Sequence, residues 1–266
     1  MHFTKMEALG NDYVYVNCLE ERLDRPDEAA RKISDRHTGI GSDGLILIEP
    51  SDVADFKMDI YNADGSRAQM CGNGIRCVGK YVFDRGLTKR ETLTIETLAG
   101  VRSLELETAH GVVKSVTVDM GIPEISDISV CLPDGGVSDL IKVDIGNPHA
   151  VSFTDSTDVC DMSVMKAVFQ SPEFPCGANV EFAQILDRYS IRMRVWERGS
   201  GETMACGTGA CAVAAACMHM GFTENSVTVK MNGGDLDIRC DTDGRVYMKG
   251  PAREVFDGYI YLGGTA

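Results

Sequence analysis

The sequence lacks an excess of positive charge. Its 266 residues contain 26 Lys and Arg against 40 Asp and Glu, which gives a formal net charge of −14 at pH 7. A chain with this balance repels phosphate backbones and anionic lipid surfaces. We therefore expect a partner that is a small molecule, and neither nucleic acid nor membrane.

We also expect neither a signal segment nor a membrane-spanning segment. Residues 1–20 mix charged and apolar side chains and have neither an apolar signal core nor a small-residue cleavage site. Residues 203–223 contain no Asp, Glu, Lys or Arg, but this stretch is too polar and too interrupted by Gly to span a bilayer. We interpret it as a buried helix and expect a cytoplasmic protein.

The cysteines lack the spacing of a zinc site or a disulfide scaffold. No two of the ten have CxxC spacing, and Cys211, Cys217 and His219 match no zinc pattern. Their share of the chain is well below that of disulfide-rich domains. We expect most of them to be small buried apolar residues, so any functional cysteine must be identified by its local context.

That context is an internal repeat. Cys71-Gly72-Asn73-Gly74 recurs as Cys206-Gly207-Thr208-Gly209 at an offset of 135 residues, close to half the chain. Gly10-Asn11 recurs as Gly146-Asn147 at nearly the same offset, each pair within an apolar, strand-like run. The length suits one large domain or two of modest size. The repeat favours two halves with one backbone plan and diverged side chains.

Each half combines short strands with two kinds of helix. We predict one amphipathic helix in each half, at 27–36 and 161–170, with acidic residues at its start. The second kind begins just after each Cys-Gly, at 74–84 and 209–220, and is apolar enough to be central. Alternating or apolar runs between turn residues predict strands at 13–17, 45–48, 57–61, 93–97, 104–107, 116–119, 142–145, 181–185, 189–196, 226–230, 236–239 and 246–249.

A cysteine at the start of a buried helix has a chemical consequence. Free backbone N–H groups and the positive end of the helix dipole stabilise a thiolate and lower the thiol pKa toward neutrality, while the adjacent Gly lets an anion approach the backbone. A single Cys-Gly-x-Gly is more simply a cysteine packed at a tight turn. The duplicated placement favours the chemical interpretation for Cys71 and Cys206.

Two thiols around one carboxylate suggest inversion of a carbon that carries one hydrogen. One base removes the proton on one face and a second group returns a proton on the other, while helix N–H groups stabilise the negative charge on the carboxylate. No lysine stands out as a Schiff-base site for pyridoxal phosphate, so no cofactor is expected.

Around these residues the sequence resembles the diaminopimelate epimerase family. The resemblance rests on MCGNGIRC at 70–77, on ERG at 197–199 leading to ACGTGAC at 205–211, and on GNDYVYV, RHTGIGSDGLILI, GNPHAV and CGANVEFAQI. It implies a cofactor-independent isomerase that interconverts LL- and meso-diaminopimelate in lysine and peptidoglycan precursor biosynthesis, commonly as a homodimer. It also implies an α/β fold of two pseudo-symmetric halves, each a barrel-like, mostly antiparallel sheet around a central helix. The halves would be residues 1–121 with 252–266, and residues 122–251, with the active site in the cleft between them.

Carried over by position, the resemblance implies that Cys71 and Cys206 are the acid/base residues, Cys71 acting on the L-configured centre and Cys206 on the D-configured centre. His149 and Glu197 would tune the pKa values of the thiols. Backbone N–H groups for the reacting carboxylate would come from Gly72, Asn73, Gly207 and Thr208. The ammonium groups and the distal carboxylate would be held by Asn11, Asn62, Asn147, Asn179, Glu197 and Arg198, a division that suits their hydrogen-bonding chemistry.

The sequence departs from the family pattern at Gly44. Some family members carry Gln there, and that side chain contacts the substrate. Here no side chain exists to do so, and we expect water or neighbouring backbone to substitute.

Two alternatives stay open at this point. Proline racemase or hydroxyproline epimerase chemistry would use the same fold and paired thiols, but its substrate has no distal charged arm for Arg198 and the asparagines to hold. A redox switch, in which Cys71 and Cys206 form a regulated disulfide, would involve no catalysis.

Overall fold

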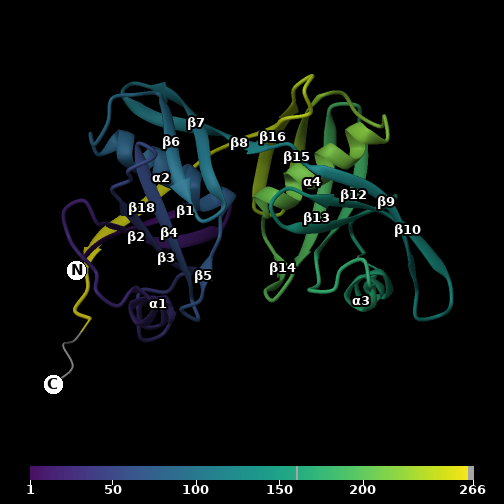
Figure 1. Cartoon of the computed structure of the whole chain (residues 1–266), viewed down its shortest axis with the longest axis horizontal. Helices are drawn as coiled ribbons and strands as arrows, with labels where there is room; N and C mark the ends of the chain where they lie inside the picture. Colours follow the sequence, from purple (N-terminus) through teal and green to yellow (C-terminus); the bar gives the residue numbers. More distant parts are fainter. Residues whose placement is uncertain (160, 263–266) are drawn as a thin grey trace. The chain divides into compact units, whose positions relative to one another are not determined.

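The structure, a computed structural model, describes residues 1–159 and 161–262, so Cys160 lies outside the described residues, as do residues 263–266 at the end of the predicted first half. The chain divides into two compact units, Met1–Val118 with Gly250–Ala266, and Asp119–Lys249. Each unit is a curved, mostly antiparallel sheet around one central helix (Figure 1). This confirms the predicted fold class.

In the first unit the strands pair in the order β18, β1, β2, β3, β4, β6, β7, β8, with the short β5 also beside β4. The pairs β2–β3 and β4–β6 are parallel and the others antiparallel. The bounds are β1 His2–Ala8, β2 Asn11–Asn17, β3 Gly44–Glu49, β4 Phe56–Asn62, β5 Arg67–Ala68, β6 Thr92–Thr97, β7 Gly100–Ala109, β8 Val112–Gly121 and β18 Arg253–Tyr259.

The second unit repeats this order as β9, β10, β11, β12, β13, β15, β16, β17, with β14 also beside β13. The corresponding pairs, β11–β12 and β13–β15, are again the parallel ones. The repeat seen in the sequence is therefore a repeat of strand order. The bounds are β9 Glu124–Cys131, β10 Val137–Asp144, β11 Pro148–Phe153, β12 Asn179–Asp187, β13 Ser190–Glu197, β14 Gly201–Thr203, β15 Ser226–Met231, β16 Gly234–Cys240 and β17 Val246–Gly250.

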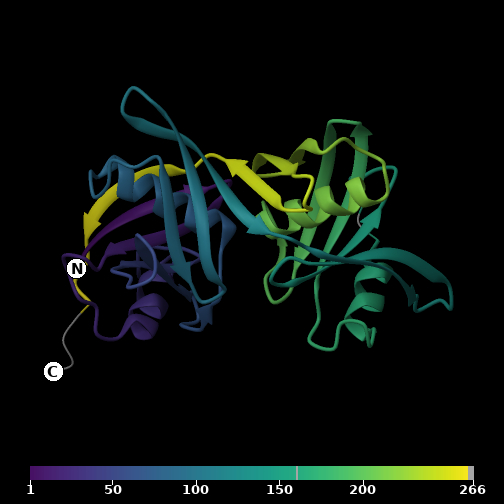
Figure 2. The same cartoon turned by 45° about the horizontal axis from the view of Figure 1, so that its top comes forward.

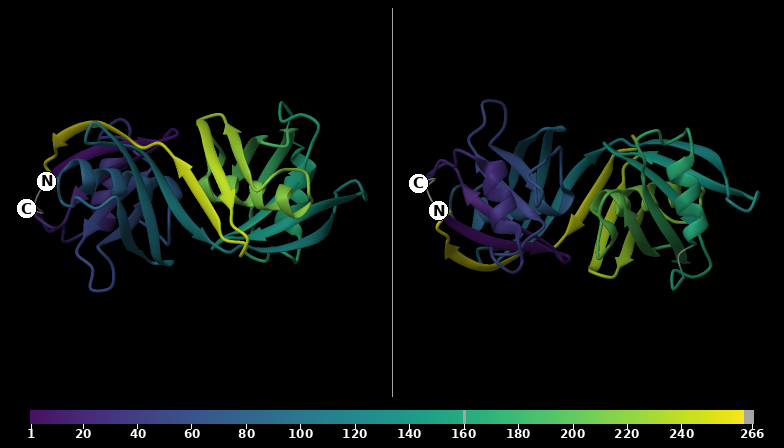
Figure 3. Two further views of the ribbon diagram at one scale, coloured as in Figure 1. Left: turned by 90° about the horizontal axis from the view of Figure 1, so that it is seen from above. Right: turned by 90° about the horizontal axis from the view of Figure 1, so that it is seen from below.

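The central helices are α2, Gly72–Asp84, and α4, Gly207–His219. Helix α2 contacts β1, β2, β7 and β18, which come from both ends of its sheet, so the sheet curls around it (Figures 2 and 3). Helix α4 contacts β10 to β13, β15 and β16 in the same way. Nearly all of α4 is buried, as expected for the uncharged stretch at 203–223.

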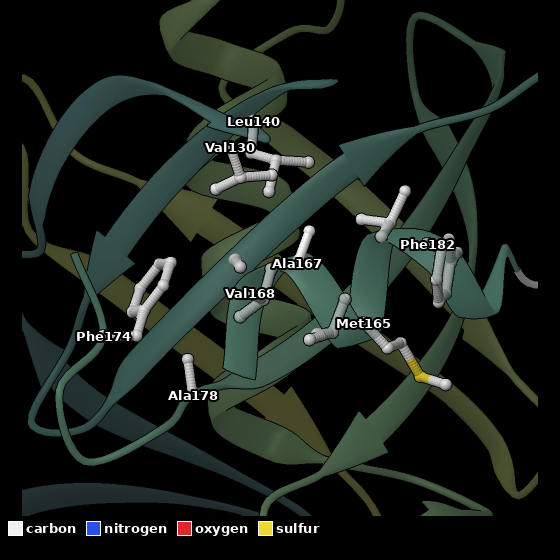
Figure 4. Close-up of a cluster of buried hydrophobic side chains, with 11 residues drawn as sticks. Val130, Leu140, Met165, Ala167, Val168, Phe174, Ala178 and Phe182 are labelled. Carbon is white, nitrogen blue, oxygen red and sulfur yellow. The ribbon is translucent and has the colours of Figure 1, made fainter. Parts of the chain in front are cut away.

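The outer helices are α1, Pro26–Ser34, and α3, Met162–Gln170, which cover the opposite faces of the sheets. Phe182 of β12 lies in one buried cluster with Met165 and Val168 of α3 (Figure 4), and Val180 belongs to the same cluster. Because side chains alternate along a strand, Glu181 between them points to the other face, toward α4. In β3, Leu45 and Leu47 likewise face α1 and Ile46 faces α2.

The structure confirms all the predicted strands, most of them with longer extents, and shows six that were not predicted, β1, β5, β9, β11, β14 and β18. Helix α1 ends at Ser34 rather than residue 36, because the Asp35 carboxylate accepts the N–H groups of His37 and Thr38 and turns the chain. Among the described residues, no helix has the length and apolar character needed to cross a membrane.

Candidate active site

Cys71 caps the central helix of the first unit. Its backbone is extended, and its Sγ accepts the N–H of Gly74 at 3.3 Å, so helix α2 begins at Gly72, two residues earlier than predicted. The thiol donates to Oδ1 of Asn11 at 3.4 Å. The first N–H groups of an α-helix have no acceptor within the helix, so those of Gly72 and Asn73 suit an anion beside the thiol.

The orientation of the Asn11 amide is set by its neighbour Asp43. The Asp43 carboxylate accepts from Nδ2 of Asn11 at 2.8 Å and from the N–H of Asp12 at 3.1 Å. A carboxylate only accepts, so the amide nitrogen must face Asp43 and the amide oxygen is left for the Cys71 thiol. The Arg36 guanidinium donates to both Asp12 and Asp43 and holds this cluster together.

The other two predicted asparagines of the first unit, Asn62 and Asn73, have different surroundings. Asn62, at the end of β4, donates to Oγ of Ser66 at 3.0 Å and is only half-buried. The Asn73 side chain is 4% exposed and accepts from the guanidinium of Arg76 at 2.9 Å. Arg76 is fully buried and also donates to the carbonyl of Gly72. The side chain of Asn73 therefore supports the helix, which leaves its backbone N–H for a ligand.

Cys206 has the same place in the second unit. Its Sγ accepts the N–H of Gly209 at 3.4 Å and lies 3.5 Å from Oγ1 of Thr208, and helix α4 begins at Gly207. The side chain is 5% exposed. Both predicted acid/base cysteines thus have one local geometry, an extended residue whose sulfur caps a buried helix.

Glu197 lies beside Cys206 at the end of β13. Its carboxylate accepts from Oγ1 of Thr203 at 2.5 Å. Burial raises the pKa of Glu197, although hydrogen bonds from Thr203 and from the Cys206 thiol act in the opposite direction. A carboxylate in contact with the thiol can accept its proton or hold the thiol as a donor.

Asn179 and Arg198 lie close to each other. The Asn179 amide oxygen accepts the backbone N–H of Arg198 at 2.9 Å. The Arg198 guanidinium donates to the carbonyl of Cys176 at 2.8 Å and is exposed. Its other N–H groups are in a position to bind a carboxylate from solvent, as its predicted role requires.

His149 lies in the second unit beside Glu181, a residue that the sequence did not point to. His149 is fully buried, with Nδ1 2.6 Å from Oε1 of Glu181 and Nε2 3.2 Å from Oδ1 of Asn147. Glu181 is also fully buried. A glutamate inside an apolar strand would ordinarily be assigned to an exposed face, and the only signal was its place two residues after Asn179.

The expected lowering of the thiol pKa is wrong for Cys206. Burial raises the pKa of this thiol well above its ordinary value, and the negative charges of Glu197 and Glu181 raise it further. The N–H of Gly209 and the hydroxyl of Thr208 lower it, but by less. In the absence of substrate Cys206 is therefore a thiol at neutral pH.

The cysteines are less buried than predicted. Cys77, Cys206, Cys211 and Cys217 are buried, but Cys18, Cys71 and Cys240 are half-buried and Cys131 and Cys176 are exposed. Among the nine described cysteines the structure shows no disulfide.

The space at Gly44 is filled by backbone and by an aromatic ring. A Cβ at this position would lie 2.1 Å from the carbonyl oxygen of Tyr61 and 2.8 Å from the ring of Tyr13. This local structure has no room for a side chain where some family members carry Gln.

Solved structures show the same fold. A probable proline racemase from Agrobacterium radiobacter superposes with a TM-score of 0.77 at 15% identity, covering 98% of this chain and 93% of the other. A hydroxyproline epimerase from Agrobacterium vitis gives a TM-score of 0.75 at 16% identity, covering 97% and 91%. A PhzF-family protein from Bacillus anthracis gives 0.75 at 17% identity, covering 98% and 99%.

Sequence comparison is more specific. A model of the family described as "Diaminopimelate epimerase" matches residues 3–126 and 141–255. Diaminopimelate epimerases from Acetivibrio thermocellus and Phocaeicola vulgatus are 50% and 51% identical to this chain, over 98% of its length and 99% and 98% of theirs. One from Methanococcus maripaludis is 48% identical over 98% of this chain and 99% of its own length.

Two similar units, each a sheet around a central helix, define the fold class that this chain shares with these solved structures. Within that class, the chain belongs to the diaminopimelate epimerase family.

Proposed function

We propose that this protein is a cofactor-independent isomerase that interconverts LL- and meso-2,6-diaminopimelate, on the route to lysine and peptidoglycan precursors. The observation that carries the proposal is family membership at about half identity over nearly the whole chain, together with both cysteines at the starts of buried helices.

In the proposed reaction, Cys71 and Cys206 act on one α-carbon from opposite faces. A thiolate takes the α-proton, the resulting carbanion shares its charge with the adjacent carboxylate, and the other thiol donates a proton to the opposite face. The N–H groups of Gly72, Asn73, Gly207 and Thr208 would stabilise the charge on the carboxylate oxygens.

The other predicted residues suit the distal arm of the substrate. Arg198 would bind the distal carboxylate, and Asn11, Asn62, Asn147, Asn179 and Glu197 would bind the ammonium groups or carboxylates according to which amide or carboxyl atom faces the ligand. Proline and hydroxyproline have no such arm. The relatives that share about half of the residues are diaminopimelate epimerases, whereas the racemase and hydroxyproline epimerase share only the fold.

The test is an assay of purified protein with LL-diaminopimelate, L-proline and trans-4-hydroxy-L-proline. We expect conversion of diaminopimelate alone, with activity unchanged after dialysis against a chelator and no absorbance from a bound chromophore. Conversion of proline with no conversion of diaminopimelate would contradict the proposal. Protein that converts none of the three and gains a Cys71–Cys206 disulfide on mild oxidation would favour the redox switch.

We also propose that the enzyme is a cytoplasmic homodimer. Two catalytic thiols need a reducing compartment to stay free. Strand β18 carries exposed apolar side chains, among them Val255 at 55% and Tyr259 at 80% exposure, which suit an interface between copies. Sedimentation equilibrium should give twice the chain mass, and Tyr259→Asp should shift the protein toward monomer.

A further inference from the structure

The matching strand registers of the two units identify the residues that occupy equivalent places. In the first unit Tyr13 of β2 pairs with Gly44 of β3, and in the second His149 of β11 pairs with Asn179 of β12. Two residues further along, Ile46 therefore corresponds to Glu181. Asn11 and Asn147 correspond in the same way, as do Asn62 and Glu197.

Ile46 and Glu181 lie under the same point of the two central helices. A Cβ on Gly74 would lie 2.6 Å from Cδ1 of Ile46, and a Cβ on Gly209 would lie 2.8 Å from Oε1 of Glu181. Gly74 and Gly209 are the residues whose N–H groups bind the two cysteine sulfurs. The first turn of α2 thus rests on an aliphatic side chain, and the first turn of α4 rests on a carboxylate.

The buried charged side chain against the first turn of the central helix differs in sign between the two units. In the first unit the guanidinium of Arg76 lies against the first turn of α2, bound to the carbonyl of Gly72 and the side chain of Asn73. In the second unit Oε1 of Glu181 pairs with His149, and Oε2 of Glu181 has no hydrogen-bond partner among the described residues. A carboxylate under a helix N-terminus offsets the positive potential that the helix dipole would otherwise provide for a thiolate.

The titratable groups that face Cys206 come from three strands: Glu197 from β13, Glu181 from β12 and, behind Glu181, His149 from β11. Among the other strands against α4, β10 carries Asp139, which accepts from Ser129, and Asp144, which accepts from the N–H of Gly146. Lys142 of β10 pairs with Glu173, and the side chains of Lys230, Asp235, Asp237 and Arg239 on β15 and β16 are exposed.

From this geometry we propose that Glu181 is a positioning residue that makes the two thiols unequal, holding His149 in place and keeping the proton on Cys206. Cys206 is then the proton donor and Cys71 the base when the enzyme meets the LL isomer. The α C–H bond breaks, its proton goes to the Cys71 sulfur, and the proton on the Cys206 sulfur moves to the opposite face of the carbon. The enzyme is left with a Cys71 thiol and a Cys206 thiolate, which suits it to the reverse reaction or to proton exchange with water.

This inference rests on the proposed two-thiol function, and its test has an arm that needs no substrate. The rate of alkylation by iodoacetamide reports the thiolate fraction of each cysteine, and peptide mapping separates Cys206 from Cys71 in the same molecule. In Glu181→Gln, which keeps the size and an acceptor for His149, alkylation of Cys206 at neutral pH should rise about tenfold, the change produced by one pKa unit. Cys71 should be unaffected.

Two control variants separate charge from packing. Glu181→Asp keeps the charge and should leave the Cys206 rate close to that of the unmodified protein. Ile46→Leu changes the equivalent site in the first unit and should alter neither rate. Thermal unfolding of each variant verifies that it is folded. An unchanged Cys206 rate in Glu181→Gln, or equal increases at both cysteines, would overturn the inference.

The second arm uses the reaction. The alkaline limb of the pH profile of kcat/KM for LL-diaminopimelate requires the Cys206 proton, and in Glu181→Gln it should move to lower pH. A limb that stays in place would overturn the inference even if alkylation changes. Absence of any diaminopimelate turnover in the unmodified protein would refute the proposed function and leave the alkylation result as an independent test of Glu181.

Discussion

At the residue scale, each cysteine sulfur takes the place that Ser, Thr, Asp or Asn usually has at the start of a helix. Cys71 and Cys206 accept the N–H of the third helical residue, Gly74 and Gly209, as a capping hydroxyl or carboxylate does. The backbone thus fixes the direction of each sulfur before any substrate binds. What differs is the surroundings, with Asn11 at Cys71 and Glu197 and Glu181 at Cys206.

Arg198→Ala tests the distal half of the proposed substrate site. The guanidinium is anchored to the carbonyl of Cys176 and is exposed before substrate binds, so its loss should cost about 2 kcal/mol of binding, near the low end for a truncated charge pair. We expect KM to rise at least about tenfold with a smaller change in kcat. Arg188→Ala, which removes an exposed pair with Glu224, is the matched control and should change neither. Unchanged kcat/KM in Arg198→Ala would reject the assignment.

The raised pKa values of two buried thiols that take no part in the proposed reaction predict how the free energy of unfolding depends on pH. Burial raises the pKa of Cys77 and that of Cys217 to about 12 in the folded protein, from an ordinary 9.0. Above pH 9 the unfolded chain releases these protons while the folded protein retains them. Stability is therefore complete below pH 9 and falls as pH rises toward 12.

At pH 10 the free energy of unfolding should be lower by about 1.4 kcal/mol per thiol than it is below pH 9. Urea unfolding of the unmodified protein and of Cys217→Ala at pH 8 and pH 10 measures it. The variant should lose less stability between the two pH values, and an identical loss in both proteins would contradict the explanation.

At the element scale, the two central helices each pack inside a curved sheet, but they do so with side chains of different size. Helix α4 is buried on all sides and consists mainly of Ala, Gly, Cys and Val, because strands approach it from several directions. Helix α2 is half-buried only at Lys80, Phe83 and Asp84 near its end, and it has larger side chains, among them Ile75, Arg76 and Tyr81. Small residues let the sheet of the second unit close around its helix.

Ala214→Leu should therefore destabilise the second unit. Ala214 is fully buried, and the added side chain has to displace neighbouring strands, at a cost of about 1–3 kcal/mol or more. Met220→Ala, at the half-exposed end of the same helix, should cost far less. Denaturant unfolding compares the two variants, and equal stabilities would mean that α4 is packed less tightly than described.

Most elements could be predicted from the sequence because their apolar pattern is strong. Four of the six missed strands had weak patterns: β5 and β14 are too short to show a period, and β9 and β18 are mostly exposed. The central helices begin earlier than predicted because Gly72 and Gly207 looked like turn residues, whereas the cysteine caps make them the first helical residues.

The residues of the candidate site also differ in how clearly the sequence indicates them. Residues in recognisable motifs, such as Cys71, Cys206 and Glu197, could be named as candidates from the sequence. Glu181 could not, because its role depends on the register of β11 with β12 and on which face of β12 meets α4. The raised pKa of Cys206 was missed for the same reason, since the sequence shows the helix start but not the carboxylates around it.

At the scale of the whole molecule, one backbone plan is used twice with different chemistry. The strand orders and the parallel pairs match between units, and so do the cysteine caps. The equivalent positions Asn62 and Glu197, and Ile46 and Glu181, differ in charge. A duplicated fold with unequal half-sites suits a reaction in which one thiol must be deprotonated while the other carries a proton.

Both cysteines should be required in both directions of the reaction. Microscopic reversibility exchanges the roles of base and acid, so Cys71→Ala and Cys206→Ala should each abolish net epimerisation of LL- and of meso-diaminopimelate. Cys131→Ala, at an exposed position far from either cap in the sequence, should retain full activity. Full activity in Cys71→Ala or Cys206→Ala would dismiss the paired-thiol mechanism.

The most direct measurement of the two-thiol claim is the fate of the α-hydrogen in D₂O. If Cys71 removes the proton and Cys206 supplies a different one, the first meso product formed from LL-diaminopimelate carries deuterium while the unreacted substrate keeps its hydrogen. Starting from the meso isomer, the same asymmetry should hold with the thiols exchanged. Mass spectrometry of substrate and product over the first turnovers reads this out. Deuterium that enters substrate and product equally from the start would show a single shared base and contradict the account.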